Sequence, residues 1–406
     1  MVLLLLASFV GAWIGHLRVP YTVGLVLVGV LVATFGVLPT STLNPDVVLT
    51  VLIPPLLFEA AYAIRWSSFR VVAAAAIALA TLGVVVSGLV TAAIMAGLAG
   101  LAGTTAIVFG FIISATDPVA VVSFFRRTRV NPDLRTLVEA ESMLNDGTMV
   151  VAIGLLPAIF AAQAMSPLSV VGDALWVILG GLAVGAVAGI AGAIGTSTTN
   201  DYLVETTLSL VVAYGSYLAA GEIGASGILA AVSAGVVLGN VGRHYGVSRT
   251  TRHEIERLWE FLAFLANSIV FLLLGVAAAP EPLLTLAPTI LIGVGATLFG
   301  RASAVYLVGW PLRWLTGVPS PPWQQVLFWG GLRGALPVVV AFLLPEELRG
   351  QSLPHLVLGV VLVTLLLQGL SLEPVLGRIL GSEAFAVSQK EDLVAPGESS
   401  GSRDAP

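Results

Sequence analysis

Two apolar stretches of the chain are each broken in the middle, the first by Ala115-Thr116-Asp117-Pro118 and the second by Gly330-Gly331-Leu332-Arg333-Gly334-Ala335-Leu336-Pro337. Proline has no backbone N–H, so Pro118 leaves the carbonyl of Ser114 without its helical partner. Pro337 does the same to the carbonyl of Arg333. Each stretch therefore predicts a membrane helix that is unwound near its middle, which is the strongest sequence indication of a transport site at mid-membrane depth.

The composition of the whole chain supports a membrane protein. Of 406 residues, 57% are hydrophobic and only 10% are charged, with a mean hydropathy of +1.00. These values exclude a soluble globular enzyme, a disordered chain and a transmembrane barrel, whose strands alternate apolar and polar residues. The net charge of −5 and the scattered arginines provide no surface for nucleic acid. The absence of Cys excludes disulfides, Fe–S clusters and thiolate metal sites.

We therefore predict an all-α polytopic membrane protein with about thirteen transmembrane helices. Spans 1–6 and 8–13 form two inverted-topology repeats around span 7, with two broken, crossing helices, spans 5 and 12. The predicted spans are 2–17, 20–38, 46–64, 71–97, 102–125, 136–163, 168–196, 202–219, 222–240, 255–279, 282–312, 322–344 and 354–376.

The distribution of arginine predicts the orientation in the membrane. With this set of spans, almost all loop arginines fall on one side, and only Arg349 falls in an opposite loop. The positive-inside rule assigns the Arg-rich side to the cytoplasm, with the N-terminus outside and the C-terminus cytoplasmic. Residues 381–406 are polar and rich in Ser, Gly and Pro, so we expect a disordered cytoplasmic tail.

The first break combines unwound backbone with a carboxylate. Asp117 precedes a proline and is biased out of the helical conformation. Thr116 lies near mid-membrane, where free backbone oxygens together with the carboxylate of Asp117 suit a hard monovalent cation such as Na⁺. The alternative is a simple proline kink in which Asp117 caps a half-helix.

A second polar motif runs from Glu139 to Gly147. Glu141 and Asn145 are four residues apart, as are Ser142 and Asp146, so the four side chains share one helical stripe. Asp146 lies near mid-depth, where a lone charged carboxylate is disfavoured, and it can exchange a proton for a cation at one site. The alternative is a polar contact between helices.

Two arginines within spans require partners. We expect Arg301 to pair with Glu141, which leaves Asp146 free to titrate. The charge of Arg333 can face the C-terminal ends of the broken helices. Other pairings of the two arginines with Glu59, Asp117 or Glu141 stay open.

The chain resembles the NhaP-type sodium/proton antiporters of the cation:proton antiporter superfamily, which are related to the animal sodium/hydrogen exchangers. The combination of the Thr-Asp-Pro and Glu-Ser-x-x-Asn-Asp motifs is the most specific part of the resemblance. The matching segments are Pro20-Tyr21-Thr22-Val23-Gly24, Pro54-Pro55-Leu56-Leu57-Phe58-Glu59, Ala115-Thr116-Asp117-Pro118, Glu141-Ser142-Met143-Leu144-Asn145-Asp146, Ser226-Gly227-Ile228-Leu229-Ala230 and Gly330-Gly331-Leu332-Arg333-Gly334.

The resemblance implies roles for these residues. Asp146 matches the essential aspartate that binds the ion and the proton, and Asn145 marks the electroneutral branch. Glu141 and Arg301 match a structural ion pair, and Arg333 matches the arginine of the second broken helix. The implied ligands of the transported Na⁺ are Asp146, Thr116, Ser142 and Glu59, with Asp117 beside them.

The resemblance also implies a homodimer. A transport core of residues 71–163 and 281–380 (spans 4–6 and 11–13) would move against a dimerisation scaffold of residues 1–70 and 164–280 (spans 1–3 and 7–10). The expected function is exchange of Na⁺, Li⁺ or K⁺ for H⁺ across the cell membrane, electroneutral and one-for-one, for pH and sodium homeostasis. We expect no cofactor and no enzymatic activity. Alternatives are a K⁺/H⁺ antiporter, a cation channel or a membrane sensor.

Overall fold

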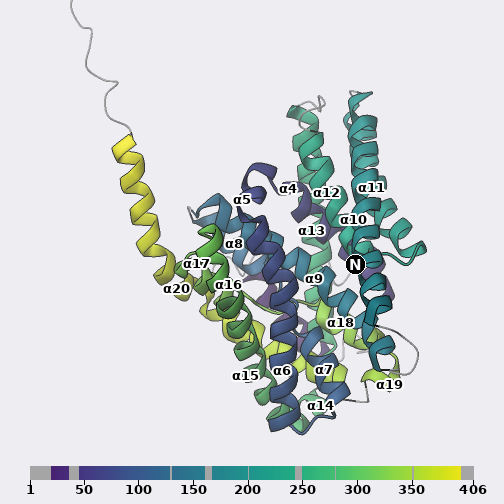
Figure 1. The fold of residues 1–406 in the computed structure, drawn as a ribbon, viewed down its shortest axis with the longest axis vertical. Helices are drawn as coiled ribbons and strands as arrows, with labels where there is room; N and C mark the ends of the chain where they lie inside the picture. The colour runs from purple at the N-terminus through teal and green to yellow at the C-terminus, as the bar shows by residue number, and fades with distance from the viewer. Residues whose placement is uncertain are drawn as a thin grey trace, which may run out of the picture.

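The computed structural model describes residues 20–35, 45–128, 130–160, 167–199, 201–242, 249–278, 280–349 and 352–394. Within these ranges every regular element is a helix, apart from one isolated β-bridge, and the predicted all-α polytopic fold is confirmed (Figure 1). Six helical stretches in this part of the chain are long and apolar enough to cross a membrane. The first predicted span, residues 2–17, lies outside the described residues.

Each predicted span from the second to the thirteenth corresponds to one helix or to a set of consecutive helices. The elements are α2 (Tyr21–Thr34), α3 (Pro45–Val47), η2 (Val48–Leu52), α4 (Ile53–Ala63), α5 (Trp66–Ala78), η3 (Leu79–Gly83), α6 (Val84–Leu98), α7 (Gly103–Ile112), α8 (Val119–Arg127), α9 (Pro132–Phe160), α10 (Pro167–Ser197), α11 (Tyr202–Glu222), α12 (Gly227–Val241), α13 (Arg249–Val276), α14 (Pro280–Thr285), α15 (Ala287–Ser303), η4 (Ala304–Val308), α16 (Gly309–Thr316), α17 (Pro321–Trp329), α18 (Leu336–Leu343), α19 (Glu346–Arg349) and α20 (Leu353–Val394).

The helices pack in two groups. One group contains α2, α4 and α10–α13, in which α10 packs on α12 and α13 packs on both α2 and α4. The other contains α5–α9, α15, α17, α18 and α20, in which α6 packs on α7 and α15, and α20 packs on α15, α17 and α18. In Figure 1, α10–α13 gather on one side of the molecule and α15, α17 and α20 on the other. Helix α9 contacts both groups.

Helices α2 and α13 approach one another so closely that only glycine fits between them. A Cβ atom at Gly29 would overlap the carbonyl oxygen of Leu272, and a Cβ atom at Gly275 would overlap that of Val26. The two backbones are therefore in direct contact. We call this contact, Gly29 with Gly275 and the two carbonyls, the glycine seam. Because a seam of backbone atoms has no side chains that can change rotamer, it fixes α13 relative to α2.

The last helix extends further than the sequence predicts. Helix α20 continues to Val394, past residue 381, where we expected a disordered tail, and it projects away from the bundle (Figure 1). Residues 382–394 include Ala, Glu, Gln and Lys, which favour a helix, so a polar composition alone does not end it. The expected disorder of residues 395–406 lies outside the described residues.

Candidate functional site

The two unwound stretches meet at one point. Helix α7 ends at Ile112 and α8 begins at Val119, while α17 ends at Trp329 and α18 begins at Leu336. Between these half-helices, the N–H of Asp117 donates a 2.8 Å hydrogen bond to the carbonyl of Leu332, which forms an antiparallel bridge. The two broken spans therefore cross at their breaks and run in opposite directions there.

The carbonyl that Pro118 leaves without a helical donor is satisfied by an arginine from the other break. Nη1 of Arg333 donates to the carbonyl of Ser114 at 2.7 Å and to that of Ala115 at 3.1 Å. Arg333 is buried, and its charge lies at the negative C-terminal end of α7. The sequence predicts this general placement, and the structure identifies the two carbonyls.

A second buried arginine stabilises the end of the other half-helix. Nε and Nη2 of Arg301 donate to the carbonyl of Leu327, near the C-terminus of α17, at 3.2 and 3.0 Å. The same guanidinium contacts Glu141 through two hydrogen bonds, at 2.7 and 3.1 Å. Glu141 is 2% exposed and Arg301 is 5% exposed, so the ion pair is shielded from water. Among the pairings that the sequence leaves open, the structure contains this one.

The Glu-Ser-x-x-Asn stripe of α9 supports the unwound turn. Nδ2 of Asn145 donates to Oγ1 of Thr116 at 2.7 Å and to Glu141 at 3.1 Å, while its Oδ1 accepts the N–H of Thr116 at 3.2 Å. The hydroxyl of Ser142 donates to the carbonyl of Thr116. Two groups expected to bind the ion, this hydroxyl and this carbonyl, are therefore bonded to each other. Neither Ser142 nor Asn145 lines the cavity described next.

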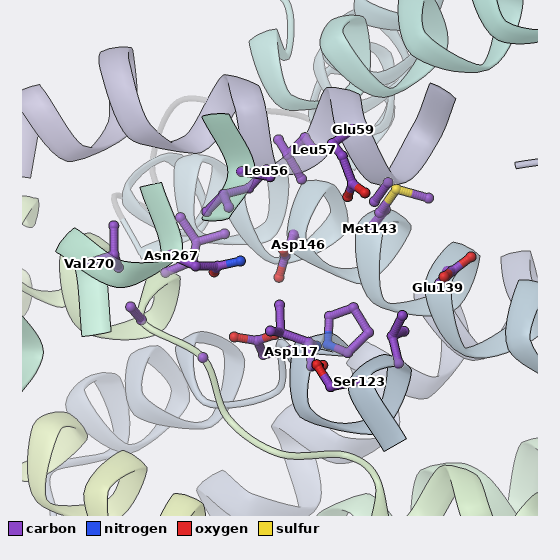
Figure 2. A pocket seen from close by; sticks show the side chains of 18 of the residues that line it. Leu56, Leu57, Glu59, Asp117, Ser123, Glu139, Met143, Asp146, Asn267 and Val270 are labelled. Atoms are coloured by element: carbon purple, nitrogen blue, oxygen red, sulfur yellow. Dashed lines mark hydrogen bonds between the residues drawn. The ribbon is translucent and has the colours of Figure 1, made fainter. Parts of the chain in front are cut away.

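A cavity of about 280 Å³ lies between the two groups of helices and contains the two aspartates. Asp146 points from α9 into this cavity, toward Asp117 (Figure 2). Asp146 makes no hydrogen bond or ion pair with the residues that the structure describes. Its carboxylate is therefore available to a proton or a cation that enters the cavity.

Asp117 is positioned by both breaks. One of its carboxylate oxygens accepts the N–H of Val119 at 2.8 Å, at the start of α8, so the predicted alternative of a capping role is realised for one oxygen. On its other side lies Gly334, where an added Cβ would be 2.8 Å from Cβ of Asp117. Glycine at this position thus lets the second break approach the aspartate. Asp117 also lines the cavity, so capping and ion binding are compatible.

Charged side chains surround the mouth of the cavity. Arg126 of α8 bonds to Glu260 of α13, and it lies 3.4 Å from Glu59 of α4. Glu59 lines the same cavity as Asp146, but unlike Asp146 it is paired with Arg126. The mouth continues into a second pocket lined by Arg65 and Arg252, which identifies it as the Arg-rich side, predicted to be cytoplasmic.

Sequence reasoning missed two features of this cavity. One is Arg126, which links the two helix groups through Glu59 and Glu260. The other is Asn267 of α13, whose side chain lines the cavity opposite Asp146 (Figure 2). A single neutral asparagine in an apolar span carries no charge signal. Arg126, by contrast, directly follows the predicted broken span, residues 102–125.

Comparison with known proteins agrees with the motifs. A family model described as "Sodium/hydrogen exchanger, transmembrane" matches residues 3–378. The chain is 38% identical over 366 residues to the Na(+)/H(+) antiporter ApNhaP of Aphanothece halophytica, covering 89% of this chain and 70% of that protein. It is 32% identical over 358 residues to the Na(+)/H(+) antiporter NhaP of Pseudomonas aeruginosa, covering 85% and 84% of the two chains.

The fold is similar to that of the sodium proton antiporter MjNhaP1 from Methanocaldococcus jannaschii. The TM-score is 0.77 at 20% sequence identity, and the match covers 94% of this chain and 97% of that one. The family model spans both broken helices and the α9 motif, which are the elements that build the cavity. The chain therefore belongs to the sodium/hydrogen exchanger family.

Proposed function

We propose that this protein is a secondary antiporter that exchanges Na⁺ for H⁺ across the cell membrane by alternating access. The observation that carries the proposal is the cavity in which Asp146 and Asp117 face one another at the crossing of two broken helices (Figure 2). Two carboxylates without a cationic partner in the described part of the chain attract a cation, and either can take up a proton instead.

One titratable carboxylate at mid-depth binds either a proton or a monovalent cation. Glu141 is neutralised by Arg301 and one oxygen of Asp117 caps α8, so the proposal assigns the exchange to Asp146. One proton moving in one direction and one cation moving in the other transfer no net charge. The proposed exchange is therefore electroneutral and one-for-one, and it serves pH and sodium homeostasis.

Na⁺ is the proposed cation because the relatives ApNhaP and NhaP are named as Na(+)/H(+) antiporters. The shape of the cavity supports alternating access. The mouth lies at Arg126 and Glu260, whereas deeper along α13 the cavity is lined by the apolar Val270 and Phe271. A cavity that is charged and open toward one side of the membrane and apolar at its inner end is the arrangement expected for one state of a transporter.

The moving parts are assigned in the same proposal. The transport core comprises residues 71–163 and 281–380, and the dimerisation scaffold comprises residues 1–70 and 164–280. The separate packing of α10–α13 with α2 and α4 supports this division. We further propose a homodimer in the cell membrane, with the N-terminus outside and the C-terminus in the cytoplasm.

The test is ion exchange by purified protein in sealed vesicles that contain a pH-sensitive dye. Addition of Na⁺ should release protons through the protein, and Li⁺ and K⁺ are tested in the same way for comparison. The rate should not respond to an imposed membrane potential. A step that moved one net charge would experience about 2.3 kcal/mol per 100 mV. A rate that changes with the clamped potential would exclude the one-for-one exchange. Cation flux without proton movement would exclude the antiporter.

A further inference from the structure

Asn267 stands out on the scaffold wall of the cavity. This wall, formed by α2, α4 and α13, is mostly apolar. The charged groups on it, Glu59 and Glu260, are paired with Arg126, and the hydroxyl of Tyr21 lies 2.9 Å from that of Ser268. The carboxamide of Asn267 makes no hydrogen bond to any residue in the described ranges. A polar group with no protein partner in a mostly apolar wall is unfavourable unless a ligand or water satisfies it.

The position of Asn267 relates it to the transport site. It lies seven residues after Glu260 on α13, which places it two helical turns, about 10 Å, deeper than the mouth of the cavity. At this depth its carboxamide points across the cavity toward Asp146 of α9 (Figure 2). Asn267 belongs to the scaffold group and Asp146 to the opposite wall, so the cavity lies between them.

The opposite wall does not offer enough oxygens for a hard cation. The hydroxyl of Ser142 is bonded to the carbonyl of Thr116, and the carboxamide of Asn145 is bonded to Thr116 and Glu141. Thr116, Ser123 and Glu139 also line this wall, but their side chains bond to Asn145, to the carbonyl of Val119 and to Arg135. The carboxylate of Asp146 and one oxygen of Asp117 remain. Hard cations are typically held by about six oxygen ligands. Water can supply some of them, and a neutral amide oxygen on the facing wall is suited to supply another.

We propose that Asn267 is a scaffold-side ligand of the transported cation and that it helps to set the cation preference. In Figure 2 the amide nitrogen of Asn267 lies nearer Asp146 than its oxygen does, and a half-turn of the carboxamide exchanges the two. When the cation sits on Asp146, the carboxamide in this turned orientation coordinates it through Oδ1 from α13. An amide adds an oxygen ligand without adding charge, so the one-for-one exchange is preserved. The inference rests on the proposed antiport function. It adds that the binding site is completed across the boundary between the two helix groups.

The test compares Asn267→Leu, which has a similar volume and no oxygen, with Asn267→Ala, Asn267→Gln and wild type. Exchange is measured in vesicles against the concentrations of Na⁺ and Li⁺ at a fixed pH. We expect the apparent KM for Na⁺ to rise by at least about tenfold in the Leu and Ala variants, since each loses a charge-assisted contact. The ratio of the Na⁺ and Li⁺ values should change, while the rate at saturating cation stays near that of wild type. The Gln variant should lie between these variants and wild type.

Ser268→Ala is the matched control. It removes the neighbouring polar group of α13, whose hydroxyl bonds to Tyr21 and to the carbonyl of Phe264, and it should leave the KM unchanged. If the Asn267 variants lower the maximum rate for every cation equally at an unchanged KM, the residue is structural and the inference is wrong. Na⁺-dependent thermal stabilisation in detergent provides a second readout. The Na⁺ concentration that gives half of the stabilisation should rise by the same factor as the KM for Na⁺. An unchanged concentration would also overturn the inference. If the wild type itself shows no exchange, the proposed function fails instead.

Discussion

The buried pair of Glu141 and Arg301 allows a quantitative prediction for two single variants and their combination. Replacing Glu141 by Leu leaves an unpaired guanidinium, and replacing Arg301 by Met leaves an unpaired carboxylate, both shielded from water. Removing one partner of such a pair costs about 3–5 kcal/mol of folding free energy. If the two costs were additive, the double variant would lose about 6–10 kcal/mol.

The structure predicts a much smaller loss for Glu141→Leu/Arg301→Met, because no charge is left unpaired. Asn145 keeps its hydrogen bond to Thr116, so the main remaining cost is the carbonyl of Leu327, which loses both of its donors. An unsatisfied buried carbonyl costs about 1–3 kcal/mol. The double variant should therefore be more stable than either single variant.

The assay is unfolding of the purified protein in detergent mixtures of increasing SDS fraction, followed by the fluorescence of its 8 tryptophans. The order of midpoints should be wild type, double variant, then the two singles. Single variants as stable as wild type, or a double variant less stable than both singles, would refute the reasoning that the pair is buried and mutually compensating. Exchange activity should fall in the two variants that lack Arg301, because the end of α17 loses its donor there.

Three further predictions concern the site itself. Asp146→Asn keeps the shape of the side chain but cannot ionise, so this variant should fold normally and lose cation-driven proton release in vesicles. Asp117→Asn should impair proton release less. Robust exchange by Asp146→Asn would assign the proton to another carboxylate. Under the proposed competition of proton and cation at Asp146, the apparent affinity for the cation should weaken about tenfold per pH unit below the pKa of the site and level off above it. An affinity that is independent of pH over a titration series would contradict this competition. Gly331→Ala places a Cβ 2.6 Å from Nε of Arg301, so it should disturb the ion pair and lower the unfolding midpoint, while Gly97→Ala, where nothing lies within 4 Å of the added Cβ, should not.

Features that depend on local backbone chemistry could be predicted from the sequence. Pro118 removes a hydrogen-bond donor wherever the chain lies, so the break and the orphan carbonyl of Ser114 follow directly from the residue type. The shared stripe of Ser142 and Asn145 follows from helical spacing in the same way.

Features that depend on which groups meet in space follow less directly from residue type. Glu141, Glu59 and Asp117 are all carboxylates, so residue type leaves several partners open for Arg301, although the expected pairing with Glu141 is confirmed. Likewise, the hydroxyl of Ser142 can bond to an ion or to a carbonyl, and spacing along one helix does not identify its partner on another. Asn267 carries neither charge nor motif, so its relation to Asp146 emerges only when α13 and α9 are placed on opposite sides of one cavity.

The glycine seam between α2 and α13 has a practical consequence for measuring motion. The chain contains no cysteine, so thiol-directed spin labels can be placed at will without a background signal. A pair of labels on the exposed faces of α2 and α13 should report one narrow distance in every ionic condition, because the backbones of the two helices are in direct contact at Gly29 and Gly275. The label pair on α2 and α13 therefore serves as an internal control. If the distribution of distances between labels on α13 and α9 broadens when Na⁺ is added, while the control distance stays narrow, the change reports displacement of α9 relative to α13.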